Sequence, residues 1–414
     1  MEENNEIIAE EFDSNIDYDS VEIRDDFDVA AGVGEDLGID IVETDEKWED
    51  ISESNITINS LDFKNALSVV SAVIIDASTD VLNKTVMIQV VGDECVFRAV
   101  SHSTHVEYRV PVVNKDNVYT DPIFVQYSYV VKVCTVLSKH IAFIVKDNGV
   151  FVRLLGGDLI LETVGNLDSD LFVMKGEVKK EIMDCEANEL FSVFKAMSPF
   201  LSNEVNVKAQ KVCIKDGFAR YVSKFLCYEI EAMKSKEPLM FKLLDVAIFK
   251  KLLTVCRGHL KFNRVEAKVA NQMLVTFDNC KLSFIMDSST FDDKVLVESE
   301  KNVSDKAFQI EFSKLYKWVN LAMVLPFSQQ TIVFGSDGPG ELTFGLQTKL
   351  GKNDIKFDSL NPEAVLEDEF TTVSSQLIVL LSGFAGFSYV DLYFADNKLS
   401  ISADGRFGKI LLSV

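Results

Sequence analysis

Residues 211–231 read KVCIKDGFARYVSKFLCYEIE, and this stretch contains the pattern that decides the fold. Lys211 to Ile214 is a short strand-like run, Lys215-Asp216-Gly217 is a turn, and Ala219 to Glu231 is a longer return arm. Alternating apolar and polar residues on both sides of an Asp-Gly turn are typical of a β-hairpin. The sequence therefore predicts a hairpin with a long second arm near the middle of the chain.

Helical patterns lie on both sides of this hairpin. Apolar residues recur at the spacing of one helix face, before the hairpin at Leu190, Val193, Phe194 and Met197 and after it at Val246, Phe249, Leu253 and Cys256. Four strand-like runs then close the unit: Leu260 to Phe262, Val265 to Val269, Met273 to Phe277 and Leu282 to Met286. The unit consists of a helix, a hairpin, a second helix and a strand meander.

The same order occurs once before this unit and once after it. The first unit opens with Ile56 to Ile58 and has a helix face (Phe63, Leu67, Val70, Ile74), runs around Gly92-Asp93-Glu94 (Cys95 to Val100, continuing to Val106 to Val110), a helix (Val130 to Leu137) and a meander (Ile141 to Val145, Val150 to Leu155, Leu159 to Thr163). The third has a helix (Leu315, Trp318, Val319, Ala322), strands (Thr331 to Phe334, Glu341 to Gln347, Ile355 to Phe357), a helix (Leu377, Leu380, Leu381, Phe384) and final strands (Val390 to Phe394, Lys398 to Ala403, Lys409 to Val414). The first-helix anchors Phe63, Leu190 and Leu315 are 127 and 125 positions apart. Such regular spacing indicates an internal repeat.

Charge is distributed unevenly along the chain. Residues 1–55 contain 21 acidic and two basic side chains, a net charge of −19, so the other 359 residues carry only −5 of the formal −24. Lys and Arg drive binding to phosphate, so a charge of −24 argues against a nucleic-acid partner, whereas a nearly neutral body does not. The acidic segment has no sustained apolar period, and we expect a disordered tail.

The repeat predicts an α+β protein with a disordered acidic tail at 1–55 and three domains at 56–175, 176–303 and 304–414. Two helices in each domain can cover only one face of its sheets. The sheets are therefore expected to continue across domain boundaries, with the six helices on one side. Closing such a series into a ring would remove its free edge strands.

This repeated unit resembles the bacterial sliding clamp of replicative DNA polymerases over residues 56–414. The resemblance lies in the order of elements, in Leu61-Asp62-Phe63-Lys64-Asn65-Ala66-Leu67, in the hairpin at Lys215-Asp216-Gly217, and in Ser402-Ala403-Asp404-Gly405 before an apolar terminal strand. It implies a head-to-tail homodimer of six domains, in which helices line a hole around duplex DNA and the sheets lie outside. DNA polymerase and clamp loader peptides are the further partners that it implies.

A clamp lumen should attract phosphate weakly and without sequence preference. The predicted DNA-facing residues are the basic side chains on or beside the predicted helices: Lys64, Lys132, Lys139, Lys195, Lys250, Lys251, Arg257, Lys314 and Lys317. Lys250, Lys251 and Arg257 are the densest group. Any one lysine can equally well serve to solvate an amphipathic helix, so the prediction concerns the set.

The resemblance also implies a partner-binding pocket between the second and third domains. By position its residues are those of the hairpin return arm and the C-terminal strand: Lys224, Phe225, Leu226, Ile410, Leu411, Leu412 and Val414. An apolar groove at a domain junction can accept an anchor side chain from a peptide. The alternative is that these residues are ordinary core. The chain also lacks the Pro- and Arg-containing terminus usual in the bacterial proteins.

Motifs for catalysis or cofactor binding are not found in the sequence. There is no GxxxxGK[ST] loop and no GxSxG elbow, and Gly32-Val33-Gly34 with Gly38 misses the GxGxxG spacing. His102 and His105 are three apart, so on a strand they point to opposite faces and cannot share a metal ion. We expect no cofactor, no metal and no enzymatic activity.

The seven cysteines are odd in number and spread singly through apolar patterns, which indicates buried free thiols in a reducing compartment. The segment Leu377 to Val390 is 14 residues long and broken by Ser and Gly, short of the ~20 that span a bilayer. The amino terminus has no basic and apolar signal region. The sequence predicts a soluble protein of the cytoplasm, prokaryotic or of an infected cell, and its distance from cellular clamps favours a viral or otherwise diverged source.

Two other functions stay open at this stage. A clamp-fold adaptor could recruit polymerase in transcription or replication without encircling DNA, and it could be a monomer where a ring is a dimer. A hydrolase or nuclease on a repeat scaffold is disfavoured by the missing site. The acidic tail could mimic DNA and occupy the lumen, although a role in solubility through charge repulsion is favoured.

Overall fold

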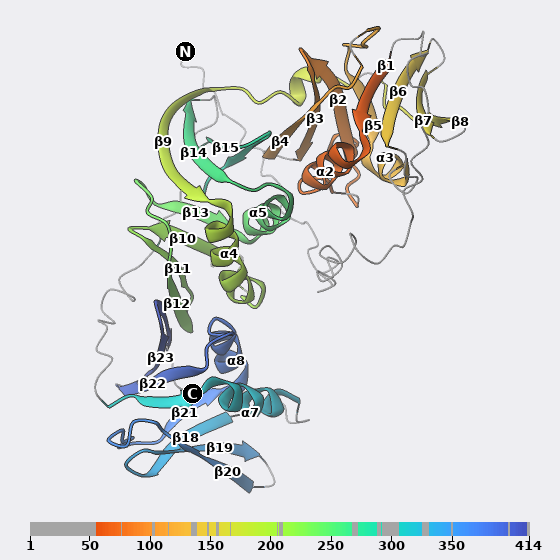
Figure 1. The fold of residues 1–414 in the computed structure, drawn as a ribbon. Coiled ribbons are helices and arrows are strands. Elements are labelled where there is room, and N and C mark those ends of the chain that lie inside the picture. The colour runs from red at the N-terminus through yellow and green to blue at the C-terminus, as the bar shows by residue number, and fades with distance from the viewer. Residues whose placement is uncertain are drawn as a thin grey trace, which may run out of the picture. The chain divides into compact units, whose positions relative to one another are not determined.

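The chain is an α+β protein, and its described residues form four antiparallel sheets and a smaller number of helices (Figure 1). The computed structural model describes residues 55–75, 77–101, 104–114, 116–133, 139–146, 149–154, 157–165, 167–204, 206, 210–266, 272–287, 291, 306–324, 331–348, 351–395 and 398–411. Residues 1–54, almost all of the predicted acidic tail, lie outside these ranges, while Asn55 is the first residue of a strand. Among the described helices, none has the length and apolar character needed to cross a membrane.

One order of elements, β-α-β-β-β-β-α-β-β-β, occurs three times. The first repeat contains β1 (Asn55–Asn59), α2 (Ser60–Val70), β2 (Thr85–Val91), β3 (Glu94–Ser101), β4 (Thr104–Pro111), β5 (Ile123–Gln126), α3 (Tyr127–Val133), β6 (His140–Lys146), β7 (Gly149–Leu154) and β8 (Gly157–Leu161), with short 3₁₀ turns at Leu82–Lys84 and, after β8, Ser169–Leu171. The second contains β9 (Glu177–Glu186), α4 (Ala187–Ser202), β10 (Lys211–Lys215), β11 (Phe218–Val222), β12 (Leu226–Glu231), β13 (Leu239–Lys242), α5 (Leu243–Val255), β14 (His259–Glu266), β15 (Gln272–Phe277) and β16 (Cys280–Ile285). The third contains β17 (Phe308–Glu311), α7 (Phe312–Val324), β18 (Thr331–Gly338), β19 (Glu341–Thr348), β20 (Gly351–Asp358), β21 (Phe370–Val373), α8 (Ser374–Ser382), β22 (Tyr389–Ala395), β23 (Lys398–Ala403) and β24 (Arg406–Ile410). The predicted three-fold order is confirmed, and the domain boundaries at 56, 176 and 304 stay a prediction.

Two sheets continue from one repeat into the next, as the sequence predicts. The first has the order β5-β2-β3-β4-β16-β15-β14-β9 and is joined where β4 pairs with β16. The second has the order β13-β10-β11-β12-β24-β23-β22-β17 and is joined where β12 pairs with β24. The two remaining sheets, β1-β6-β7-β8 and β20-β19-β18-β21, have four strands each. Adjacent repeats therefore share continuous hydrogen-bond ladders.

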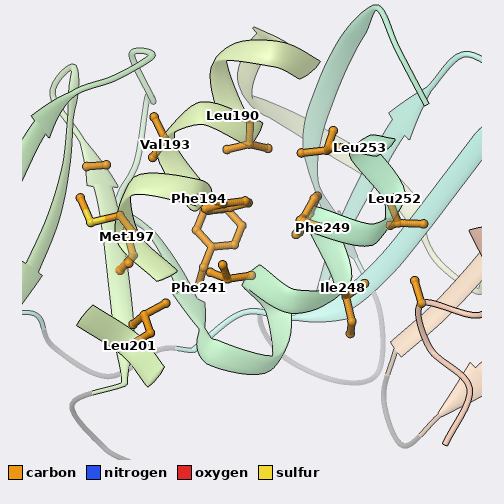
Figure 2. Close-up of a cluster of buried hydrophobic side chains, with 14 of the residues drawn as sticks. Leu190, Val193, Phe194, Met197, Leu201, Phe241, Ile248, Phe249, Leu252 and Leu253 are labelled. Carbon is orange, nitrogen blue, oxygen red and sulfur yellow. The ribbon is translucent and has the colours of Figure 1, made fainter. Parts of the chain in front are cut away.

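Helices α4 and α5 of the second repeat pack against each other through buried apolar side chains (Figure 2). The ring of Phe194 in α4 lies 5.7 Å from that of Phe249 in α5 and 5.1 Å from that of Phe241 in β13, measured between centroids. Fully burying one such ring contributes roughly 1.5–3 kcal/mol. Helix α2 also contacts α5, and α4 contacts α8, so helices of neighbouring repeats touch.

The repeats also share a polar feature on the opposite face of the sheets. Arg98 lies directly across from Glu107 with a 2.7 Å contact, and Arg220 lies across from Glu229 with a 2.6 Å contact. The two pairs occupy equivalent strands and are each nine residues apart in sequence. Burial raises the pKa of Glu107, but hydrogen bonds from Arg98 and Arg109 hold it below its ordinary value. A charged pair at equivalent positions supports a true structural repeat.

Three details of the sequence prediction are wrong. Each repeat has a fourth strand before its second helix, at β5, β13 and β21, which was missed because four residues are too few to show a period. The long return arm in the first and second repeats is two paired strands, β3 with β4 and β11 with β12. The predicted runs Leu260 to Phe262 and Val265 to Val269 belong to one bulged strand up to Glu266, because Asn263 and Arg264 interrupt the apolar pattern.

The turn that opens the hairpin in the second repeat has the predicted geometry. Asp216 and Gly217 both have positive φ, 55° and 85°. A two-residue turn with positive φ at both positions matches the right-handed twist of its strands, and Asp-Gly is a preferred pair there. This turn fixes the register in which Lys215 pairs with Phe218.

Candidate functional site

The described helices carry a net positive charge because acidic residues are scarce on them. The six described α-helices contain seven lysines and three acids, a net charge of +4, whereas residues 56–414 as a whole carry −5. The remaining part of residues 56–414 therefore carries −9. One of the three helical acids, Asp245, is buried and accepts a hydrogen bond from the backbone N–H of Lys242 at 2.9 Å, so it caps α5. The helices thus form the basic part of an otherwise acidic protein.

Four of the predicted DNA-facing lysines that lie on helices are exposed and form no ion pair with another described residue: Lys64, Lys195, Lys251 and Lys317. They come from α2, α4, α5 and α7, and so from all three repeats. Each helix buries its apolar stripe against the sheets, which directs these side chains to the opposite side. Figure 2 shows the buried stripe of α4 and α5.

Other members of the predicted set have local partners. Lys250 is half-buried and its Nζ donates to Ser198 Oγ at 3.1 Å, which links α5 to α4. Lys314 Nζ lies 2.9 Å from a carboxylate oxygen of Glu311. The ammonium of Lys132 lies 5.3 Å from the ring centroid of Tyr129. These side chains are less available to a ligand than the four exposed lysines.

Lys139 and Arg257 lie beside helices rather than on them. Lys139 directly precedes β6, and its carbonyl accepts a hydrogen bond from the backbone N–H of Ser60. Arg257 follows the last turn of α5 and is exposed. Both therefore occupy junctions between a helix and a strand.

Five of the predicted pocket residues come together where β12 meets β24. Leu226 is paired with Ile410, and the backbone N–H of Leu411 donates to the carbonyl of Phe225 at 2.7 Å. Leu226 and Ile410 are buried, Leu411 is half-buried, and the side chain of Phe225 is 43% exposed. Lys224 is exposed beside Phe225. Leu412 and Val414 lie outside the described residues.

The junction beside this site is held by groups that the sequence did not reveal. The hydroxyl of Tyr228 donates to the carbonyl of Gly383 at 2.7 Å, and the guanidinium of Arg406 donates to the same oxygen. The ring of Tyr228 is stacked on that of Phe200 at 4.4 Å, and burial raises the pKa of the Tyr228 hydroxyl to about 12. Contacts between residues 155 positions apart leave no local sequence signal.

The thiols and histidines form no recognisable centre among the residues that the structure describes. Six cysteines are buried and free, and burial raises the pKa of Cys185 and Cys227 to about 12, so both are protonated at neutral pH. The seventh, Cys134, lies outside the described residues.

His102 likewise lies outside those residues, and His105 lies in β4 opposite Val100 and Ser283. Burial lowers the pKa of His105. Within the described ranges no group of three or more His, Cys, Asp and Glu side chains could hold a metal ion.

Two edge strands are a second feature that the sequence did not single out. β8 has one partner among the described strands, β7, and β20 likewise has β19. On β8 the side chains of Leu159 and Ile160 are 47% and 64% exposed. Because successive strand residues point to opposite faces, this edge has a large exposed apolar side chain on each face, and a further strand from another chain could cover both.

Comparison with solved structures identifies the fold. A DNA polymerase III beta subunit from Eubacterium rectale matches with a TM-score of 0.72 at 12% identity. The DNA polymerase sliding clamp of Pseudomonas aeruginosa matches with 0.70 at 14%, and the beta clamp of Helicobacter pylori bound to a DNA ligase peptide with 0.69 at 11%. In each case the match covers 87% of this chain and 99% of the other. No family model and no curated protein matches the sequence. The chain has the fold of the bacterial sliding clamps.

Proposed function

We propose that the chain is a DNA sliding clamp, a ring-shaped processivity factor that encircles duplex DNA and tethers a polymerase. The observation that carries this proposal is that two edge strands, β8 and β20, are the equivalents of the strands that pair across the internal junctions. At both internal junctions the last strand of one repeat pairs with the strand equivalent to β4 in the preceding repeat, as β16 does with β4 and β24 with β12. The strands left over are β8 and β20.

A second copy would satisfy both edges. β8 of one copy would pair with β20 of the other in the manner of β16 with β4, and the reverse contact would close a head-to-tail homodimer. Burying Leu159 and Ile160 in that contact would add apolar burial worth a few kcal/mol to the new backbone hydrogen bonds. The ring would consist of six domains with the proposed boundaries.

Duplex DNA is the ligand that the helix charge favours. A ring stays on DNA because it is topologically linked, so it needs weak attraction to phosphate and no base contacts. A net +4 on the helices against −9 on the rest of residues 56–414 supplies such attraction on one set of surfaces only. The set of DNA-facing residues given above is part of this proposal.

Partner peptides would bind at Phe225 and Leu411. The clamp of Helicobacter pylori is solved with a DNA ligase peptide, which supports peptide binding as a property of the fold. A polymerase or loader peptide with an apolar anchor fits the exposed ring beside the β12–β24 ladder.

The test measures the mass of the protein in solution and its topological linkage to circular DNA. Sedimentation equilibrium should give twice the chain mass of 46.3 kDa for the wild type and the single chain mass for Ile160→Asp. The matched control is Leu61→Asp, because the side chain of Leu61 in α2 is 65% exposed, and it should leave the mass doubled.

Wild-type protein that has been diluted and reconcentrated with circular DNA should stay bound in high salt and be released when the DNA is linearised. A monomeric wild type would instead favour an adaptor that recruits polymerase without encircling DNA. Equal retention on circular and linear DNA would refute encirclement.

A further inference from the structure

The start of β12 presents an aromatic ring and an ammonium group side by side. Phe225 is 43% exposed, and the Nζ of exposed Lys224 lies 5.4 Å from the centroid of its ring. At an exposed site such a cation–π contact contributes roughly 0.5–1 kcal/mol. The ammonium therefore rests over the ring surface that an incoming apolar side chain would cover.

The turn that carries these two residues is fixed by its own hydrogen bonds. The hydroxyl oxygen of Ser223 accepts from the backbone N–H groups of Phe225 and Leu226, each at 3.3 Å. The backbone N–H of Ser223 in turn donates to the carbonyl of Leu226 at 2.9 Å. The backbone position of Phe225 is therefore set before a partner arrives, which lowers the entropy cost of binding.

The neighbouring strand adds an apolar side chain and a second cation. Leu411 is bonded to Phe225 through the backbone, and Lys409 is opposite Cys227 in the same ladder. Residues two apart in an extended strand share a face, so Lys409 and Leu411 point to the same side of the sheet. The nearby carboxylate of Glu229 is already engaged by Arg220 at 2.6 Å. The exposed ammonium of Lys224 is therefore the charge that lies beside the ring of Phe225.

We propose that the corner formed by Lys224, Phe225 and Leu411 selects partner peptides that carry an acidic side chain next to an apolar anchor. This inference rests on the proposed function, because it assigns the chemistry of the peptides that a clamp would bind. An anchor on Phe225 must move the ammonium of Lys224 off the ring. A carboxylate beside the anchor receives that ammonium, whereas a neutral flank leaves it without a partner.

Fluorescence anisotropy with three short labelled peptides tests the inference. The peptides share a central Leu-Leu anchor and differ only in flanks of Glu, Ser or Lys. One exposed charge pair contributes up to about 1 kcal/mol, so the Glu peptide should bind about fivefold more tightly than the Ser peptide at low salt. The Lys peptide should bind least, and high salt should reduce the differences.

Single variants separate the effect of the Lys224 charge from that of the Phe225 ring. Lys224→Ser should abolish the preference for the Glu peptide and tighten binding of the Ser peptide slightly, because no ammonium has to leave the ring, whereas Phe225→Ser should weaken both. Lys234→Ser is the matched control, because Lys234 is exposed at the opposite end of β12, and it should change neither.

Equal binding of the Glu and Ser peptides to the wild type would overturn the inference. A preference that persists in Lys224→Ser would overturn it as well. Binding of none of the peptides would refute the corner as a docking site, whereas retention on circular DNA tests the proposed ring separately.

Discussion

A quadruple serine variant tests the helix charge directly, because it removes the four exposed helix lysines that form no ion pair with another described residue: Lys64, Lys195, Lys251 and Lys317. The change takes the described helices from a net +4 to zero. None of the four is buried, so no cavity forms and the melting temperature should stay close to that of the wild type.

The loss of DNA affinity follows from the number of charges removed. Each lysine that contacts a phosphate contributes about 0.9 to the slope of log K against log salt, so the slope should fall by up to about 3.6 per chain. At about 0.5 kcal/mol for each exposed contact, the affinity near 0.1 M salt should fall about thirtyfold. Anisotropy of a labelled duplex across a salt series measures both quantities.

A second quadruple variant makes the same charge change elsewhere. It replaces exposed lysines that lie on strands or loops: Lys175, Lys234, Lys261 and Lys281. If the helices face DNA, this variant should keep the wild-type slope and lose little affinity. An equal loss in both variants would show that net charge alone governs binding, and an unchanged slope in the helix variant would refute a DNA-facing role for these lysines.

Two further predictions concern stability. Gly383→Ala would place a Cβ 2.6 Å from the Tyr228 ring and 2.8 Å from that of Phe200, and this overpacking should destabilise the junction by about 1–3 kcal/mol in thermal melts, whereas Gly165→Ala, whose Cβ meets nothing within 4 Å, should not. Burial raises the pKa of Asp245 from 3.8 to about 6, so the folded state favours the protonated carboxyl. Above pH 6 the ionised carboxylate therefore lowers the stability of the protein, and this cost disappears as the pH falls toward 4. Asp245→Asn keeps an oxygen for the N–H of Lys242 and should stabilise the protein at pH 7 by up to about 3 kcal/mol, with little gain at pH 4; an equal gain at both values would contradict the assignment.

The order of elements could be predicted because it depends on local patterns. The anchors Phe63, Leu190 and Leu315 are all fully buried, as the helix-face spacing requires. The division of the return arm into two strands could not be predicted in the second repeat, because Ser223-Lys224-Phe225 contains none of the Gly, Asn or Pro that usually mark a turn. Its turn is made by the Ser223 side chain, which leaves only a weak signal in sequence.

Only part of the site could be predicted, because contacts between residues far apart in the sequence bring it together. The pairing of Leu226 with Ile410 joins residues 184 positions apart, and its placement came from resemblance rather than from any local pattern. The sequence prediction also treated Lys250 and Lys251 alike. In the structure Lys251 is exposed and Lys250 is half-buried, because neighbouring helix residues point in different directions around the axis. Their difference depends on the partner that α4 provides at Ser198.

The composition of the edge strands β8 and β20 bears on the choice between the proposed ring and a monomeric adaptor. Soluble proteins protect edge strands with lysine, proline, bulges or a covering segment. β20 carries Lys352 and Lys356, but β8 reads GDLIL and has neither lysine nor proline, while its two large apolar side chains are exposed. A monomer would leave that edge open to aggregation, whereas a closed dimer uses each β8 and each β20 once and leaves neither exposed. The composition of β8 therefore favours the ring independently of the helix charge.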